Sequence, residues 1–198
     1  MSLRDTNLQQ LIDLSQRIIS DSCEPRAVAA GARVFARLSA REGSLGAVTA
    51  ERLPVCHHTI DAALAGLAAE SSPLPELATA FAAIEGELAW GRRRNAEAVG
   101  EPFFGGHANA MLVGPRGLEE RDDVMVGVTV MAPQIVYPDH AHPPEEVYIA
   151  LSPGEWWNAD MDWTEPGPGG IIYNPPGILH AMRSRGAPFL ALWFLPID

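Results

Sequence analysis

The fold is decided by the stretch Tyr137-Pro-Asp-His140-Ala-His142-Pro-Pro-Glu145-Glu146-Val-Tyr148. It begins at the end of one predicted strand and enters the next. His140 and His142 are two residues apart, so on an extended backbone their imidazoles leave on the same face. Glu146 and Tyr148 share a face for the same reason. If the Pro-Pro turn folds one strand against the other, two imidazoles and a carboxylate converge.

His180 supplies a third imidazole, just past the turn-forming run Tyr173-Asn-Pro-Pro-Gly. Three histidines and one glutamate suit a first-row divalent ion, and Fe, Zn, Mn, Co and Ni all remain open. The alternative is that His140, His142 and Glu146 are polar groups of a loop. That alternative leaves the regular spacing of four metal-competent side chains unexplained.

The spacing resembles the two motifs of the cupin superfamily. In the first motif, His-x-His is followed after three residues by Glu, as at His140, His142 and Glu146. The second motif, Gly-x5-Pro-x-Gly-x2-His, is matched from Gly169 to His180. The resemblance implies a double-stranded antiparallel β-barrel, with one divalent transition metal ion held inside it by the three histidines and Glu146.

The composition changes near residue 100: residues 1–99 are rich in Ala, Leu, Arg and Glu, whereas residues 100–198 contain most of the Gly and Pro. This change predicts a helical N-terminal segment (1–99) and a β-barrel (100–198) in a mainly β, α+β protein. Thr6 and Gln9 form a capping-box pattern that predicts the start of the first helix. Pro25 fits the first turn of a second helix. Apolar periodicity predicts further helices over 60–69 and 77–89. Apolar or alternating runs separated by turn residues predict strands over 110–113, 124–132, 146–151, 170–173 and 189–194.

The helical first half, the barrel and the run YPDHAHPPEEVYIALS together resemble the DddQ-type dimethylsulfoniopropionate lyases. The resemblance covers the barrel well, and the helical half only by length and character. It implies cleavage of a small zwitterion, dimethylsulfoniopropionate, into dimethyl sulfide and acrylate by β-elimination. It also implies that Tyr148 is the base and that Tyr137 lines the pocket, as a substrate contact or as support for the metal.

Such an elimination removes a weakly acidic proton next to a carboxylate. A metal that binds the carboxylate offsets its charge, and a metal beside a phenol favours the phenolate. The dimethylsulfonium group is a cation, which aromatic faces attract. Tyr137, Tyr173 and Trp193 lie on or beside predicted strands and are the expected aromatic wall for this group. Trp156, Trp157 and Trp163 flank a predicted loop and could equally lie at the surface.

Two other classes of function stay open. One is a cupin dioxygenase that uses Fe(II), because the same four ligands also support oxygen chemistry. The other is a non-enzymatic regulator of the anti-sigma type, which also joins helices to a cupin barrel. That class needs a zinc-binding His/Cys cluster in the helices, whereas Cys23 and Cys56 stand alone and read as two reduced thiols or, less simply, one disulfide. His57, His58 and His107 have no partners at recognisable spacing, so we expect solvated or capping roles.

Composition excludes several chemistries. All 14 basic residues are Arg, so the chain has no lysine for a Schiff base, a pyridoxal-phosphate anchor or a P-loop. The net charge of −11 argues against binding of nucleic acid. No window resembles a targeting peptide or a membrane span, so we expect a cytoplasmic protein. A homodimer is compatible with the sequence.

Overall fold

The computed structural model describes residues 4–197. Its helices are α1 (Thr6–Ser20), α2 (Pro25–Ala40), α3 (Cys56–Leu67), α4 (Leu74–Ile84), the 3-10 turn η1 (Glu85–Glu87), α5 (Ala96–Val99) and α6 (Phe103–Gly106). Its strands are β1 (Ser44–Leu45), β2 (His107–Val113), β3 (Glu119–Glu120), β4 (Val124–Met131), β5 (Val136–His140), β6 (Glu146–Ala150), β7 (Glu155–Asn158), β8 (Met161–Thr164), β9 (Ile171–Asn174), β10 (His180–Arg183) and β11 (Phe189–Pro196).

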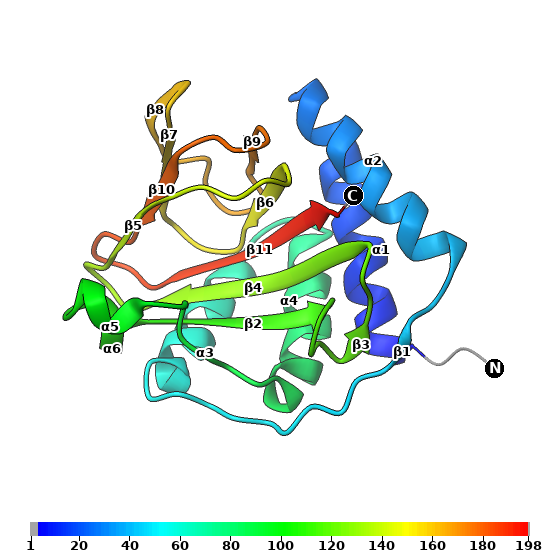
Figure 1. Ribbon diagram of the computed structural model, residues 1–198, viewed down its shortest axis with the longest axis horizontal. Helices are drawn as coiled ribbons and strands as arrows, with labels where there is room; N and C mark the ends of the chain where they lie inside the picture. The colour runs from blue at the N-terminus through cyan, green and yellow to red at the C-terminus, as the bar shows by residue number, and fades with distance from the viewer. Residues whose placement is uncertain (1–3, 198) are drawn as a thin grey trace.

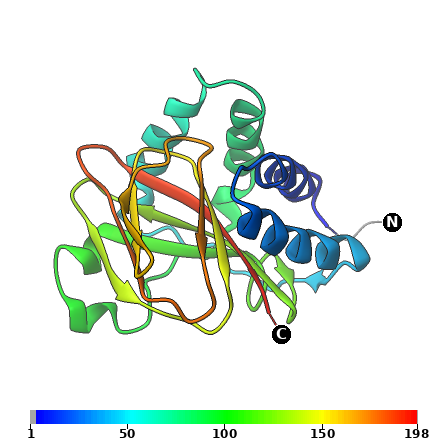
Figure 2. The same ribbon diagram turned by 90° about the horizontal axis from the view of Figure 1, so that it is seen from above.

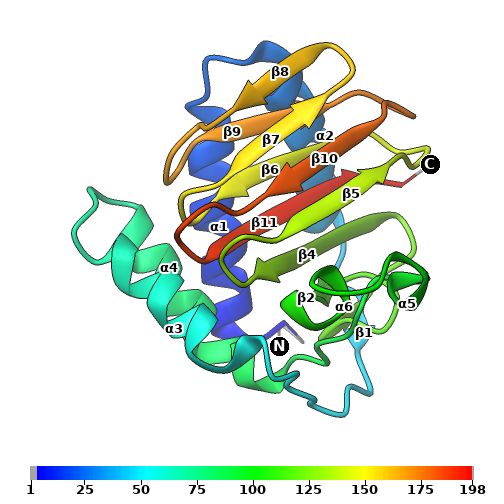
Figure 3. The ribbon, with the colours of Figure 1, turned by 90° about the vertical axis from the view of Figure 1, so that its left-hand side faces the viewer.

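The strands form two sheets that close into a barrel. The larger sheet has the order β1-β3-β2-β4-β11-β6-β9, and the smaller has the order β5-β10-β7-β8. The neighbouring strands of the barrel run antiparallel, as Figure 3 shows for β4, β11 and β6. The expected mainly β fold, a double-stranded barrel preceded by helices, is confirmed.

Helices cover the outer face of the larger sheet. Helix α2 packs on β11, β6 and β9, and α3 packs on β11 and β4. Figure 1 shows α1 and α2 beside the sheet, and Figure 2 shows the blue and cyan helices along two sides of the barrel. One face of α1 is apolar and buried, with Leu8, Leu11 and Ile19 almost fully enclosed. No helix among residues 4–197 combines the length and apolarity that a membrane span requires.

Alternation along the strands of the larger sheet divides the interior into two cores. In β11, Leu190, Leu192 and Phe194 pack toward the helices, whereas Phe189 and Ala191 pack inside the barrel. This division follows from the pleat, because successive side chains of a strand point to opposite faces. One face of each central strand therefore holds the helices in place, and the other lines the barrel.

Some predicted boundaries were wrong. The first helix is capped by Asp5 rather than by a capping box at Thr6, because the Asp5 carboxylate accepts the backbone N–H groups of Asn7 and Leu8. The third and fourth helices each begin and end earlier than expected. None of the predicted strand ranges covers β1, β3, β5, β7, β8 or β10, which are two to five residues long.

The surface alternative is wrong for Trp156. Trp156 and Trp157 lie in β7 and Trp163 lies in β8, on either side of the turn at 159–160. Trp156 is 1% exposed and packs on Phe189 inside the barrel, while Trp163 is exposed and stacks with Arg183. The structure also excludes a solvated role for His107, which is buried.

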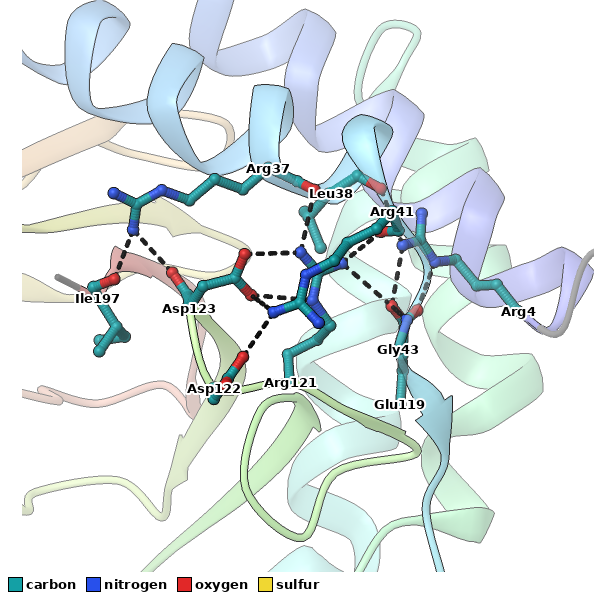
Figure 4. Close-up of polar contacts among 10 residues, drawn as sticks. All are labelled: Arg4, Arg37, Leu38, Arg41, Gly43, Glu119, Arg121, Asp122, Asp123 and Ile197. Carbon is teal, nitrogen blue, oxygen red and sulfur yellow. Dashed lines mark hydrogen bonds and ion pairs between the residues drawn. The ribbon is translucent and has the colours of Figure 1, made fainter.

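Buried charges fasten the N-terminal residues to the barrel, as Figure 4 shows. The carboxylate of Glu119 accepts hydrogen bonds from the Arg4 guanidinium and from the backbone N–H of Gly43. Arg121 donates to Asp123 and to the backbone carbonyl of Arg37 in α2. Strand β1 also pairs with β3, so residues from the first hundred join the larger sheet. The division of the chain at residue 100 stays a prediction.

Candidate metal centre and active site

The histidines of the two motifs meet at the junction of β5, β6 and β10. His140 ends β5 and His180 begins β10, and the two residues are direct partners in the antiparallel register. Their ring centroids are 4.0 Å apart, and that of His142 lies 5.0 Å from the ring of His180. One ligand atom from each of the three lies within 4.8 Å of the others. Among residues 4–197, no other group of His, Cys, Asp and Glu side chains has this geometry.

Backbone carbonyls orient all three imidazoles. The Nδ1 atoms of His140, His142 and His180 lie 3.0, 2.9 and 3.0 Å from the carbonyl oxygens of Pro138, Pro144 and Ile178. These contacts place the proton on Nδ1 and leave each Nε2 lone pair for a metal, as in most histidine-ligated sites. Nε2 of His180 is buried and makes no hydrogen bond within the described residues. A buried Nε2 atom that makes no hydrogen bond and lies beside two further imidazoles fits a bound cation.

Glu146 adds a carboxylate at the first residue of β6. Its Oε2 lies 3.3 Å from Nε2 of His142 and 3.4 Å from Nε2 of His180. The amide of Asn174 donates to the same oxygen at 3.3 Å, and Asn158 in turn donates to Asn174 at 3.0 Å. Burial by itself would raise the pKa of Glu146, but the contacts from His142 and His180 prevail and hold it well below its usual value.

The protonation state of His140 also suits a cation. Burial, followed by the neighbouring His180, lowers the pKa of His140 to about 4. His140 is therefore neutral near pH 7, which is the form in which an imidazole binds a metal. Burial alone would lower the pKa of His142, but its contact with Glu146 prevails and raises that pKa. The four side chains together present three imidazole nitrogens and one carboxylate. This set of donors suits a first-row divalent metal.

The site opens into a cavity of about 1080 Å³. Tyr148, Tyr137 and Trp193 line this cavity together with the cluster of His140, His142 and Glu146. Tyr148 is 2% exposed, and burial, followed by the charge of Glu146, raises its pKa well above the usual value for tyrosine. The ring of Tyr137 lies 4.9 Å from that of His140.

Tyr173 does not join this group. It is not among the residues that line the cavity, and its hydroxyl donates to Glu145 at 3.0 Å. The guanidinium of Arg26, from α2, lies 5.1 Å from the centre of its ring. The reason is alternation along β9: the next residue, Asn174, points inward to Glu146, so Tyr173 points to the helices. Glu145 is itself paired with Arg33 of α2.

Four residues of the site were missed by sequence reasoning. Asn109 and Thr129 are polar residues in otherwise apolar stretches of β2 and β4, and both line the cavity. That interruption is a signal the sequence contains. Arg93 also lines the cavity, but it lies in a loop with no strand pattern to place it. Asn174 was quoted only as a turn residue.

The cysteines and the remaining histidines stay outside the site. Cys23 is exposed and Cys56 is buried, and both are free thiols, so the disulfide alternative is excluded. Burial raises the pKa of Cys56 to about 11. The ring of His107 stacks on Phe103 at 3.7 Å, and its Nδ1 contacts the carbonyl of Phe103. The helices of the described chain thus contain no zinc-binding His/Cys cluster, which an anti-sigma regulator of this type needs.

Two solved structures share the fold. The crystal structure of the dimethylsulfoniopropionate lyase DddQ from Ruegeria pomeroyi aligns with a TM-score of 0.73 at 24% identity, over 98% of this chain and 93% of that one. A chain from the crystal structures of the dimethylsulfoniopropionate lyases RdDddP and RnDddQII aligns with a TM-score of 0.71 at 22% identity, over 96% and 92%. At these identities the alignments show the fold.

Sequence comparisons identify the family. The chain is 31% identical over 114 residues to the dimethylsulfoniopropionate lyase DddQ from Ruegeria pomeroyi, which is 57% of each protein. It is 30% identical over 116 residues to the putative dimethylsulfoniopropionate lyase DddL from Cereibacter sphaeroides, which is 58% of this chain and 48% of that protein. The matches thus span about half the length of these curated relatives. Residues 27–191 match the family model itself, and the chain therefore belongs to the dimethylsulfoniopropionate lyase family.

Proposed function

We propose that the protein is a metal-dependent dimethylsulfoniopropionate lyase that releases dimethyl sulfide and acrylate by β-elimination. The observation that carries the proposal is the meeting of three histidines and Glu146 with two buried tyrosines in one cavity. Membership of the lyase family supports the substrate class. The proposed ligands of the metal are His140, His142, Glu146 and His180.

The elimination needs a base and a cavity that holds both ends of the substrate. In our proposal the Tyr148 oxygen takes the proton from the carbon next to the carboxylate. The electron pair of that C–H bond forms the C=C bond of acrylate, and the C–S pair leaves with dimethyl sulfide. The leaving group is neutral, so no acid is required there. A divalent ion held by the four ligands supplies positive charge that stabilises the charge building on the substrate and favours the phenolate form of Tyr148.

The remaining cavity residues suit the two ends of a zwitterion. The indole face of Trp193 offers aromatic surface for the sulfonium methyl groups. Burial of Tyr148 keeps water from the proposed base. Tyr173 forms no part of this wall, because its hydroxyl is bound to Glu145.

A product assay tests the proposal. Purified protein loaded separately with Fe, Mn, Co, Ni and Zn is incubated with dimethylsulfoniopropionate, and dimethyl sulfide and acrylate are measured. We expect both products with at least one metal, and no product with any of the five would refute the activity. His180→Ala should lose metal and turnover together. Tyr148→Phe should keep its metal and lose nearly all turnover, and a fully active variant would remove Tyr148 as the base.

Measurement of oxygen consumption separates the other functions. A cupin dioxygenase would consume oxygen with a thiol or diketone substrate, whereas the lyase works equally well under nitrogen. A regulator would show neither activity. A cytoplasmic location and a homodimer also belong to the proposal, and cell fractionation and light scattering test them.

A further inference from the structure

A chain of three hydrogen bonds runs along the cavity wall to Tyr137. Trp193 Nε1 lies 3.1 Å from Thr129 Oγ1, and Thr129 Oγ1 lies 2.6 Å from Asn109 Oδ1. Asn109 Nδ2 lies 3.3 Å from the hydroxyl oxygen of Tyr137. The four residues come from β11, β4, β2 and β5, and all of them line the cavity. This series of hydrogen bonds therefore connects β5, which carries the candidate ligand His140, to the larger sheet.

The chemistry of its first member gives this chain a single direction. An indole N–H can only donate, so Thr129 accepts from Trp193 and turns its own hydrogen to Asn109. The 2.6 Å contact is short for an N–H donor and ordinary for an O–H donor, which identifies the Asn109 atom nearest Thr129 as oxygen. The amide nitrogen of Asn109 must then face Tyr137. The Tyr137 oxygen accepts this bond, so its own hydrogen is left to point elsewhere.

We propose that Trp193, Thr129 and Asn109 are positioning residues, which hold the Tyr137 hydroxyl so that it donates a hydrogen bond to the substrate in the cavity. This inference rests on the proposed lyase function, and it assigns Tyr137 to substrate contact. It also gives Trp193 a second role besides its aromatic face. Because the indole N–H can only donate, Trp193 sets the donor-to-acceptor direction of all three hydrogen bonds.

The surroundings of Tyr137 indicate what its hydroxyl binds. The guanidinium of Arg93 lies 5.5 Å from the centre of the Tyr137 ring, and no carboxylate pairs with it among residues 4–197. The carboxylate of Glu146 is already engaged by two histidines and Asn174. A donor beside an unneutralised positive charge favours an anionic acceptor. The carboxylate oxygen of the substrate is the acceptor of this class.

Close packing fixes the start of the chain. Gly127 lies opposite Trp193 in the register of β4 and β11, and its missing side chain makes room for the indole. A Cβ atom at Gly127 would lie 2.1 Å from Cζ2 of Trp193. The indole therefore rests directly on the backbone of β4. This contact holds Nε1 beside Thr129, two residues further along the same strand.

Removal of the Thr129 hydroxyl breaks the chain with little change of shape. Thr129→Val leaves the amide of Asn109 free to turn, and misplacement of Tyr137 should lower kcat about 10–100-fold, with a smaller change in KM. Thr129→Ser restores the hydroxyl and should recover most of kcat. Thr164→Val is the matched control, because Thr164 is exposed in β8 and should keep wild-type kinetics.

A double-mutant cycle separates positioning from a general loss of structure. Thr129→Val should add little to the defect of Tyr137→Phe, because both remove the same hydrogen bond to substrate. Additive losses would overturn the inference, as would a Thr129→Val variant with wild-type kcat in an active enzyme. If the wild-type protein itself releases no dimethyl sulfide, the proposed function is what fails.

A spectroscopic readout tests the chain without any substrate. The indole N–H signal of Trp193, assigned by its loss in Trp193→Phe, should shift in the NMR spectrum of Thr129→Val and return toward its wild-type position in Thr129→Ser. An unchanged indole signal in Thr129→Val would show that Trp193 does not donate to Thr129. That result would overturn the inference whatever the activity of the protein.

Discussion

Substitution of Glu119 by Gln tests whether the buried charges in Figure 4 hold the N-terminal residues on the barrel. The side chains of Arg4 and Glu119 are 3% and 5% exposed, and the backbone N–H of Gly43 adds a hydrogen bond of 2.7 Å. Glu119→Gln keeps the shape but removes the negative charge that faces the guanidinium groups of Arg4 and Arg121. Removing one partner of such a buried pair costs about 3–5 kcal/mol of unfolding free energy. For a chain of this length, that loss lowers Tm by roughly 6–20 °C.

The same change at the surface is the matched control. Glu24 pairs with Arg26 at 3.0 Å, but these side chains are 35% and 60% exposed. Exposed pairs contribute at most about 1 kcal/mol, so Glu24→Gln should leave Tm nearly unchanged. Thermal unfolding followed by circular dichroism compares the two variants at pH 7. Equal Tm values for Glu119→Gln and Glu24→Gln would refute the assignment of stability to the buried pair.

The Glu119 pair also has a predictable pH dependence. Burial alone would raise the pKa of Glu119, but the hydrogen bonds from Arg4 and Gly43 outweigh it and lower the pKa. A carboxyl whose pKa is lowered on folding stabilises the fold above its unfolded pKa, about 4.3, and loses that effect as the pH falls to the folded value. Below about pH 4.3, wild-type stability should therefore fall more steeply than that of Glu119→Gln. Parallel curves would contradict this account.

Three further outcomes follow from the site. Asn174→Ala removes the donor to Glu146 and should weaken metal binding about 10–100-fold in a chelator competition; unchanged affinity would exclude an orienting role. Gly127→Ala forces the Trp193 ring to move and should cost about 1–3 kcal/mol of unfolding free energy in urea titrations, whereas a wild-type midpoint would show that the ring adapts freely. A divalent metal at 100 times its Kd should raise the unfolding free energy by about 2.7 kcal/mol, with a much smaller rise in His180→Ala.

The meeting of the candidate metal ligands was predictable because its geometry is mostly local. His140, His142 and Glu146 fall within seven residues, so the period of an extended strand and one turn place them together. His180 was found through the motif and not through its strand. β10 reads His-Ala-Met-Arg, which shows no strict alternation of apolar and polar residues.

Tyr173 and Asn109 show where sequence reasoning stopped. A single strand gives the alternation of its residues but not which face is turned inward, so Tyr173 was assigned to the cavity although it faces α2. The face is decided by pairing across the sheet, where Asn174 lies opposite Glu146. Asn109 was missed because its partners, Thr129 and Tyr137, come from other strands. Long-range contacts of this kind have no signature within a short window.

The alternation of β11 has a consequence for how the sequence can change. Leu190, Leu192 and Phe194 hold the helices, whereas Ala191 and Trp193 face the barrel interior. Neighbouring residues of this strand thus determine two separable properties, resistance to unfolding and the shape of the cavity. In random mutagenesis of β11, substitutions at even-numbered positions from 190 to 194 should lower stability, and those at 191 and 193 should alter the cavity. Substitutions that reshape the cavity can therefore be made at alternate positions of β11 without changing the residues that contact the helices.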